Sequence, residues 1–300
     1  MDGILNINKP SGMTSFDVVG RVRRLAGTKK VGHAGTLDPD ANGVLPVCIG
    51  RATKIIEFLM DKDKTYRVGL LLGTSTDTQD SSGRIIYEKP VTSTEEEIER
   101  IIRGFVGKQE QIPPMYSAIR VDGQRLYNLA RKGIEIDRKP RIVTFHRIDI
   151  ISIEREQDKV KVQMEVECSK GTYIRTLCHD IGEKLNCGGH MFSLTRTVSG
   201  PFSIAESYTL KDLEELQSQN SLNKAIIEMD KALMQFPAVD LPKKDAKKLK
   251  NGLFLPAGNL NSGYCRLYNE GIFLAIGTVF EKNGNNFLKS YKWINLEMDL

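Results

Sequence analysis

The chain has 300 residues, of which 40% are hydrophobic and 27% charged, and its formal net charge at pH 7 is +5. This composition is typical of a soluble globular protein of about two domains, and the longest apolar runs are too short to span a bilayer. The N-terminus has no basic stretch followed by an apolar one, so we expect no secretory leader and a cytoplasmic location.

The first predicted helix covers TSFDVVGRVRRLAG, residues 14–27. Thr14 is a suitable N-cap, and Asp17 stands at the third helical position, where its carboxylate can complete a capping box. Four apolar residues recur at helical spacing and should share one face. They are Phe16, Val19, Val22 and Leu25.

The stretch LDPDANG, residues 37–43, places three acceptor side chains at alternate positions. The pattern D-x-D-x-N-G begins an EF-hand loop, but such a loop needs a Glu six residues after the glycine, and this position is Ile49. A turn accounts for the proline and the Asn-Gly pair. A carboxylate held in such a turn beside small residues suits a nucleophile or a general base, which makes Asp38 a candidate for that role.

The next elements are strands and one helix. Residues 66–73 and 160–168 have strand patterns, and in the second segment apolar and polar residues alternate strictly. A helix should begin after Thr94, with Glu97 completing its capping box. Because helices and strands are interspersed without βαβ regularity, we predict an α+β fold on a mixed, mainly antiparallel sheet with flanking helices.

Residues 116–141 form an arginine-rich segment with one short helical pattern near 124–132. Long excursions of this kind inside compact domains tend to be functional or disordered. Residues 118–149 hold eight Lys or Arg against four acids. Such a segment can follow a phosphate backbone, although a solvated surface without a partner explains the charge equally well.

Residues 171–185, GTYIRTLCHDIGEKL, have a helical pattern whose buried stripe should be Ile174, Leu177, Cys178, Ile181 and Leu185. Arg175 falls at the edge of this stripe. An arginine there either extends to water or pairs with a buried acid and keeps it ionised. The neighbouring Cys178, His179, Cys187 and His190 match no zinc pattern, so we expect no metal and reduced thiols.

The composition changes near residue 234, where short β segments and turns begin. We therefore predict a first domain over 1–233 and a small β-rich domain over 234–300. The one helical stretch of the second domain carries five lysines. They are Lys243, Lys244, Lys247, Lys248 and Lys250.

Five stretches closely resemble the bacterial tRNA pseudouridine synthase B family and occur in the family's order. They are GILNINKPSGMTSFDVV, GHAGTLDPDANGVLPVCIGRATK, KTYRVGLLLGTSTDTQD, QIPPMYSAIRVDGQRLYNLARKG and CSKGTYIRTLCHDIGEKL, spread over residues 3–185. The β-rich tail is similar to the PUA module, a small RNA-binding β-barrel that ends such enzymes. The resemblance implies a pseudouridine synthase catalytic domain followed by a PUA-like domain.

The resemblance also assigns roles to individual residues. Asp38, in the family's G-T-L-D-P motif, matches the catalytic aspartate, and Arg175 matches the arginine paired with it. Tyr66 matches the tyrosine that stacks on the flipped base, and Leu194 a leucine that lines the pocket. An insert at about 118–146 should clamp the RNA. Further expected RNA-binding residues are His33, Asp80, Lys9 (in a motif that also supports the site), Arg120, Arg125, Arg131, Lys132 and Arg141.

The implied reaction converts the uridine at position 55 in the T loop of tRNA to pseudouridine. It loses no atoms and changes no oxidation state, so no cofactor is expected. The expected partner is the T arm of tRNA, without a guide RNA or a membrane, and we expect a monomer. One alternative is a guide-RNA-dependent relative, which should lack the insert. Another is an RNA-binding protein or chaperone without catalysis.

Overall fold

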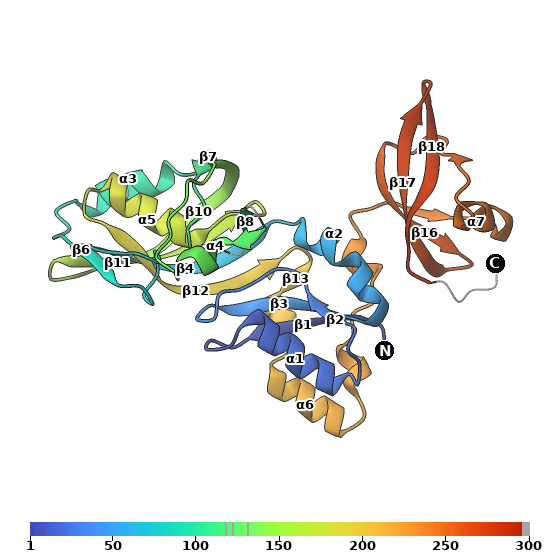
Figure 1. The fold of residues 1–300 in the computed structure, drawn as a ribbon, viewed down its shortest axis with the longest axis horizontal. Coiled ribbons are helices and arrows are strands. Elements are labelled where there is room, and N and C mark those ends of the chain that lie inside the picture. Colours follow the sequence, from blue (N-terminus) through green and yellow to red (C-terminus); the bar gives the residue numbers. More distant parts are fainter. Residues whose placement is uncertain (118, 122, 131, 296–300) are drawn as a thin grey trace.

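The computed structural model describes residues 1–117, 119–121, 123–130 and 132–295. Within these residues, a nine-stranded sheet follows the order β1-β3-β12-β4-β11-β10-β7, with β2 paired to β3 and β13 to β12 (Figure 1). Its strands are β1 (Gly3–Lys9), β2 (Val31–His33), β3 (Asn42–Ile49), β4 (Lys64–Leu72), β7 (Gly107–Gln111), β10 (Arg141–Glu156), β11 (Lys159–Cys168), β12 (Gly189–Ser199) and β13 (Phe202–Ser203).

The pairing in this sheet is antiparallel except between β12 and β3, which run parallel. That parallel contact pairs Thr195 with Asn42 and Arg196 with Gly43. Strand β11 alternates between buried and half-buried residues along its whole length. These features confirm the predicted α+β fold on a mixed, mainly antiparallel sheet.

Four longer helices pack on the large sheet: α1 (Ser15–Leu25), α3 (Glu95–Arg103), α5 (Ile174–Lys184) and α6 (Leu210–Ser218). Their apolar sides contribute to one core cluster with the strands. In Figure 1, α1 and α6 lie together beside β1, while α3 and α5 lie at the β10 and β7 end. Shorter elements are η1 (Gly50–Ile55), α2 (Ile56–Met60), β5 (Thr74–Thr76), β6 (Ile85–Glu88), η2 (Ile204–Glu206), η3 (Leu222–Ala225) and η4 (Lys231–Leu233).

The predicted caps are present with one difference. Thr14 and Asp17 form the complete capping box of α1. At α3, the Thr94 side chain accepts from the Glu97 N–H, while the Glu97 carboxylate lies 3.9 Å from Arg100. The predicted face of α1 was wrong for Phe16, which is 65% exposed. The buried side of α1 is instead Ser15, Val18, Val19 and Val22.

The excursion from the sheet lies between β7 and β10, at residues 112–140. It contains a small hairpin, β8 (Arg120–Val121) and β9 (Gln124–Arg125), followed by the helix α4 (Leu126–Ala130). The insert was predicted to extend to about residue 146. Because β10 begins at Arg141, residues 141–146 belong to the sheet instead.

A second, five-stranded sheet has the order β14-β16-β17-β18-β15 and forms a separate body in Figure 1. Its elements are β14 (Ala238–Asp240), α7 (Lys243–Lys250), β15 (Leu255–Pro256), β16 (Gly263–Asn269), β17 (Ile272–Lys282) and β18 (Asn285–Trp293). The sheet curls into a half-barrel, in agreement with the predicted β-rich module. A domain boundary at 233/234 stays a prediction.

The two bodies meet through an aromatic group at α2. The ring of Phe58 lies 5.7 Å from that of Phe236, 5.0 Å from Tyr264 and 5.9 Å from Tyr291. Lys54 adds a hydrogen bond from its ammonium to the Trp293 carbonyl, at 2.6 Å. In the part of the chain that the structure describes, no helix is long and apolar enough to cross a membrane.

Candidate active site

The loop at residues 34–41, between β2 and β3, carries Asp38 and is held in place by the buried side chain of Lys9. The Lys9 ammonium donates to three backbone carbonyls, those of Pro10 at 2.9 Å, Met13 at 2.6 Å and Pro39 at 3.0 Å. Lys9 has no exposed surface. It therefore supports the turn that contains Asp38, while the expectation that it also contacts RNA stays a prediction.

The end of this loop needs a glycine. Gly43 has a φ of +103°, and a Cβ atom there would lie 2.2 Å from the carbonyl oxygen of Arg196. Only a residue without a side chain allows β3 to approach β12 this closely. The Asn-Gly pair that was predicted as part of a turn thus also forms the start of the parallel contact between the two strands.

Asp38 forms an ion pair with Arg175, which lies in the first turn of α5. The Nε atom of Arg175 is 3.0 Å from Oδ2 of Asp38, and Nη2 is 3.4 Å from Oδ1. The arginine side chain is 7% exposed and the aspartate side chain 40%. Of the two open readings of Arg175, pairing with an acid is the one found, and the acid keeps one side open to solvent.

The rest of the Arg175 guanidinium is also occupied. Nη2 donates to the Tyr116 carbonyl at 2.9 Å and Nη1 to the Thr78 carbonyl at 3.4 Å. Nη1 also lies 3.7 Å from Oδ2 of Asp80. Because its N–H donors are bound to several acceptors at once, the guanidinium is held in one position and fixes the orientation of the Asp38 carboxylate.

Burial and charge act in opposite directions on Asp38. Burial raises the pKa of its carboxyl above the ordinary value, and the Arg175 charge opposes that rise. The charges of Asp80 and Asp40 add to the rise in this pKa. A carboxylate that is paired yet somewhat more basic than usual is suited to nucleophilic attack or to proton abstraction.

Tyr66 lies on β4, cross-strand from Arg196 of β12, and only 9% of it is exposed. Burial raises the pKa of its phenol, while the charge of the neighbouring Arg196 lowers it. Leu194 stands opposite Val68 on the same pair of strands and packs partly buried against the core. Asp38 and Arg175 are thus in direct contact, and the charge of Asp38 also raises the pKa of the Tyr66 phenol. Leu194 lies on the strand next to that of Tyr66.

The other predicted RNA-binding residues are less uniform. His33 ends β2 half-buried, and burial lowers the pKa of its imidazole. The Asp80 carboxylate accepts from Thr78, at 2.6 Å, and from the Ser82 N–H, at 3.0 Å. Lys132 and Arg141 are exposed. Arg120 and Arg125 pair through their backbones in the β8–β9 hairpin, and Arg131 lies outside the described residues.

Two residues of this region were not anticipated from the sequence. Arg196 is buried between the Asp38 loop and Tyr66. Gln111, at the end of β7, both accepts from the Tyr173 N–H at 2.8 Å and donates to the Tyr173 carbonyl at 3.0 Å. This amide holds the start of α5, and with it Arg175, in place. A polar residue predicted to be buried at a strand end would have been the signal for Gln111.

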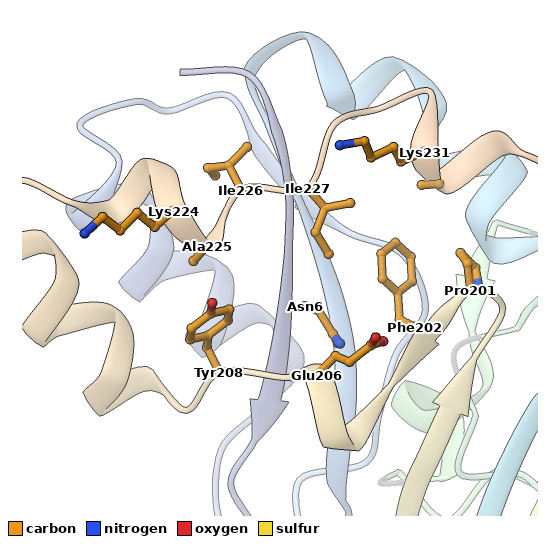
Figure 2. Close-up of a pocket in the computed structure, with 11 residues that line it drawn as sticks. Asn6, Pro201, Phe202, Glu206, Tyr208, Lys224, Ala225, Ile226, Ile227 and Lys231 are labelled. Carbon is orange, nitrogen blue, oxygen red and sulfur yellow. The ribbon is translucent and has the colours of Figure 1, made fainter.

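Among the residues that the structure describes, no group of three His, Cys, Asp or Glu side chains is arranged to hold a metal ion. The five cysteines are free and buried. A cavity of about 350 Å³ lies beside β1 and is lined by Asn6, Phe202, Glu206, Tyr208 and neighbouring residues (Figure 2). It shares no lining residue with the group around Asp38.

Comparison with known proteins gives a consistent result over most of the chain. The model of the TruB family pseudouridylate synthase N-terminal domain matches residues 23–174, and that of the tRNA pseudouridylate synthase B C-terminal domain matches residues 175–234. A tRNA pseudouridine synthase B of Clostridium perfringens is 47% identical over 290 residues, 94% of this chain and 96% of that protein. Its counterpart in Clostridium kluyveri is 49% identical over 283 residues, covering 92% and 95%.

Two solved structures have a similar fold over nearly the whole chain, including the residues after 234 that the two family models do not match. A chain of a Cbf5-Nop10-Gar1 complex has a TM-score of 0.74 and 27% identity, covering 98% of this chain and 85% of that one. A chain of an H/ACA RNP bound to a substrate RNA containing 2′-deoxyuridine has a TM-score of 0.72 and 26% identity, covering 98% and 85%. The chain belongs to the TruB family of pseudouridylate synthases.

Proposed function

We propose that the protein isomerises the uridine at position 55, in the T loop of tRNA, to pseudouridine, and that it does so without a guide RNA. The observation that carries this proposal is the ion pair of Asp38 and Arg175 beside Tyr66. The names of its relatives support tRNA as the substrate. We further propose that it acts as a monomer in the cytoplasm.

The reaction begins with the exposure of the base. A uridine in a folded T loop is stacked, so it must leave its stack before an enzyme can reach the glycosidic bond. The Tyr66 ring can replace the lost stacking, which is worth about 1–3 kcal/mol per base. Because burial holds the phenol pKa above its usual value, Tyr66 keeps its proton near neutral pH. The neutral ring is suited to stacking, and the base that removes the C5 proton is water or Tyr66.

Asp38 acts at the sugar or the base once the uridine is in place. It attacks C1′, removes the C2′ proton, or attacks C6, and each route leads to the same exchange of bonds. The N1–C1′ bond breaks, the uracil turns, and the C5–C1′ bond forms. C5 then loses its proton to a general base, water or Tyr66, and N1 gains one. Arg175 keeps the carboxylate ionised and oriented throughout.

The excursion at residues 112–140 supports action without a guide RNA, since the guide-dependent relatives are expected to lack it. The first residues of this segment contact the site directly, because the Tyr116 carbonyl accepts a hydrogen bond from Arg175. Lys132 in this segment and Arg141 just after it are exposed, and we propose that such cations contact phosphates. Recognition would then depend mainly on the folded shape of the T arm.

The test uses a tRNA transcript with tritium at uridine C5, purified full-length protein, EDTA and no guide RNA. We expect tritium release from the transcript and none from a transcript that carries cytidine at position 55. The Asp38→Asn variant should bind tRNA and release nothing, while Asp40→Asn, in the same turn, should behave like the wild type.

Three results would contradict the proposal. A folded wild-type protein that binds tRNA but releases no tritium would be an RNA-binding protein or chaperone. Release by Asp38→Asn at the wild-type rate would remove Asp38 from the chemistry. Release that depends on an added guide RNA would place the protein with the guide-dependent relatives.

A further inference from the structure

Arg196 is a fully buried arginine at the centre of the large sheet. It is 1% exposed, and its Nε donates to the Val44 carbonyl at 2.7 Å. Nη1 donates to the Thr36 carbonyl at 3.4 Å, and Nη2 to the Gly35 carbonyl at 3.3 Å. Among the ion pairs of the described residues, none joins Arg196 to a carboxylate.

The groups around this guanidinium belong to the two halves of the proposed site. Gly35 and Thr36 lie in the loop that carries Asp38, and a Cβ atom on Gly35 would lie 3.5 Å from Nη1 of Arg196. On the other side of Arg196 lies Tyr66, its cross-strand neighbour in the β4–β12 pair. One side chain therefore connects the catalytic loop to the stacking ring.

We infer that Arg196 is a positioning residue for the isomerisation, one that fixes the Asp38 loop and the Tyr66 ring relative to each other. The inference rests on the proposed function. It assigns Arg196 no contact with the reacting atoms. Its contribution is geometric, and displacement of a catalytic group by about 1 Å can lower a rate by about 100-fold.

The chemistry of the side chain supports this role over a purely structural one. Burial of a cation without a carboxylate costs stability, and apolar side chains of similar volume often stabilise a core better. The planar guanidinium, however, can direct separate N–H donors at several carbonyls at once, which an ammonium cannot do in the same plane. The three carbonyls that accept from it belong to Val44, near the start of β3, and to Gly35 and Thr36, in the loop before Asp38.

The C-terminal module supplies a matched control. Arg266 is 8% exposed, donates from Nε to the Phe236 carbonyl at 2.9 Å, and donates from Nη1 to the Tyr268 phenol at 3.0 Å. It is thus another buried arginine that holds backbone and a tyrosine, but it is remote from Asp38 in sequence and lies in the other sheet. Arg266→Lys should test what such an arginine contributes to stability alone.

The experiment compares full-length Arg196→Lys with Arg266→Lys in tritium release, tRNA binding, thermal melting and amide hydrogen exchange. For Arg196→Lys we expect kcat to fall about 100-fold, while the Kd for tRNA stays within about threefold because the exposed RNA-binding cations are intact. Exchange of the amides in residues 34–41 should accelerate about tenfold. For Arg266→Lys we expect lower thermal stability with kcat and the exchange of this loop unchanged.

Arg196→Gln keeps the test decisive where Arg196→Lys fails to fold, because it removes the unpaired buried charge and retains an N–H donor. It should lose kcat as well. A folded variant of either kind with kcat close to the wild type, or with unchanged exchange in residues 34–41, would overturn the inference. If the wild type itself releases no tritium, the proposed function fails, and the exchange measurement still decides whether Arg196 holds the loop.

Discussion

Two regions of the molecule combine an aspartate, an arginine and a tyrosine, and they use them differently. At the C-terminal module, the Arg266 guanidinium donates to the Tyr268 phenol, and that phenol donates at 2.9 Å to Oδ2 of Asp230, which precedes the module in the sequence. This chain of hydrogen bonds ends on a carboxylate. Burial and the Asp230 carboxylate raise the pKa of Tyr268 to about 12, so this phenol keeps its proton at neutral pH.

In the large sheet the same residue types are separated. Asp38 pairs with Arg175 and remains 40% exposed, while Tyr66 is the cross-strand neighbour of a second arginine, Arg196. The acid and the phenol therefore each lie beside an arginine of their own. The difference indicates that the first group attaches a domain, whereas the second leaves its acid free for a substrate.

The largest effect expected from this comparison is on Arg175. Arg175→Lys should lower kcat about 100-fold or more, because an ammonium cannot span both oxygens of Asp38 and still reach the Tyr116 carbonyl. Single-turnover tritium release measures the loss, and circular dichroism checks the fold. Asp230→Asn, at the corresponding acid of the other group, should leave kcat unchanged. Equal losses in the two variants would remove the distinction between the regions.

Two glycines sharpen the comparison at the level of stability. Gly43→Ala should lower the free energy of unfolding by about 3 kcal/mol or more, because the positive φ costs about 1–2 kcal/mol and the new Cβ would meet the Arg196 carbonyl at 2.2 Å. Gly271, in the β16–β17 turn, has a φ of +76° with nothing within 4 Å of a Cβ. Gly271→Ala should therefore cost only about 1 kcal/mol. Urea unfolding of both variants measures the difference.

The smallest effect concerns pH. Since the pKa of the Asp38 carboxyl is raised and the ionised form is the active one, the acid limb of kcat/KM should have its midpoint above the ordinary aspartate value. The Asp80 charge contributes to that rise, so Asp80→Asn should move the limb to lower pH. The shift should be modest because Asp38 is partly exposed. A limb that moves to higher pH would contradict the assignment.

The local parts of the site were predictable from the sequence. The turn that carries Asp38 follows from the chemistry of proline and the Asn-Gly pair. The helix that carries Arg175 follows from its apolar stripe, whose five predicted residues are all buried. The resemblance then connected Asp38, Arg175 and Tyr66, which neither spacing nor periodicity could do.

The parts that depend on distant contacts were not predictable. Strand β12 was missed because HMFSLTRTVS does not alternate cleanly, and its buried Arg196 resembles a surface residue. The burial of Lys9 was not predictable either, since it depends on the three carbonyls that surround its ammonium. The requirement for glycine at position 43 exists only because β12 passes beside it.

The position of β12 also has a consequence for how the chain acquires its active form. Although β3 and β4 follow each other in the sequence, β12 lies between them in the sheet. Contacts between such distant segments form slowly, because a long stretch of chain must close first. During synthesis, we therefore expect the loop that carries Asp38 to reach its native conformation only after residues 189–199 have left the ribosome. Fragments that end before β12 should contain Asp38, Tyr66 and Arg175 and still be inactive.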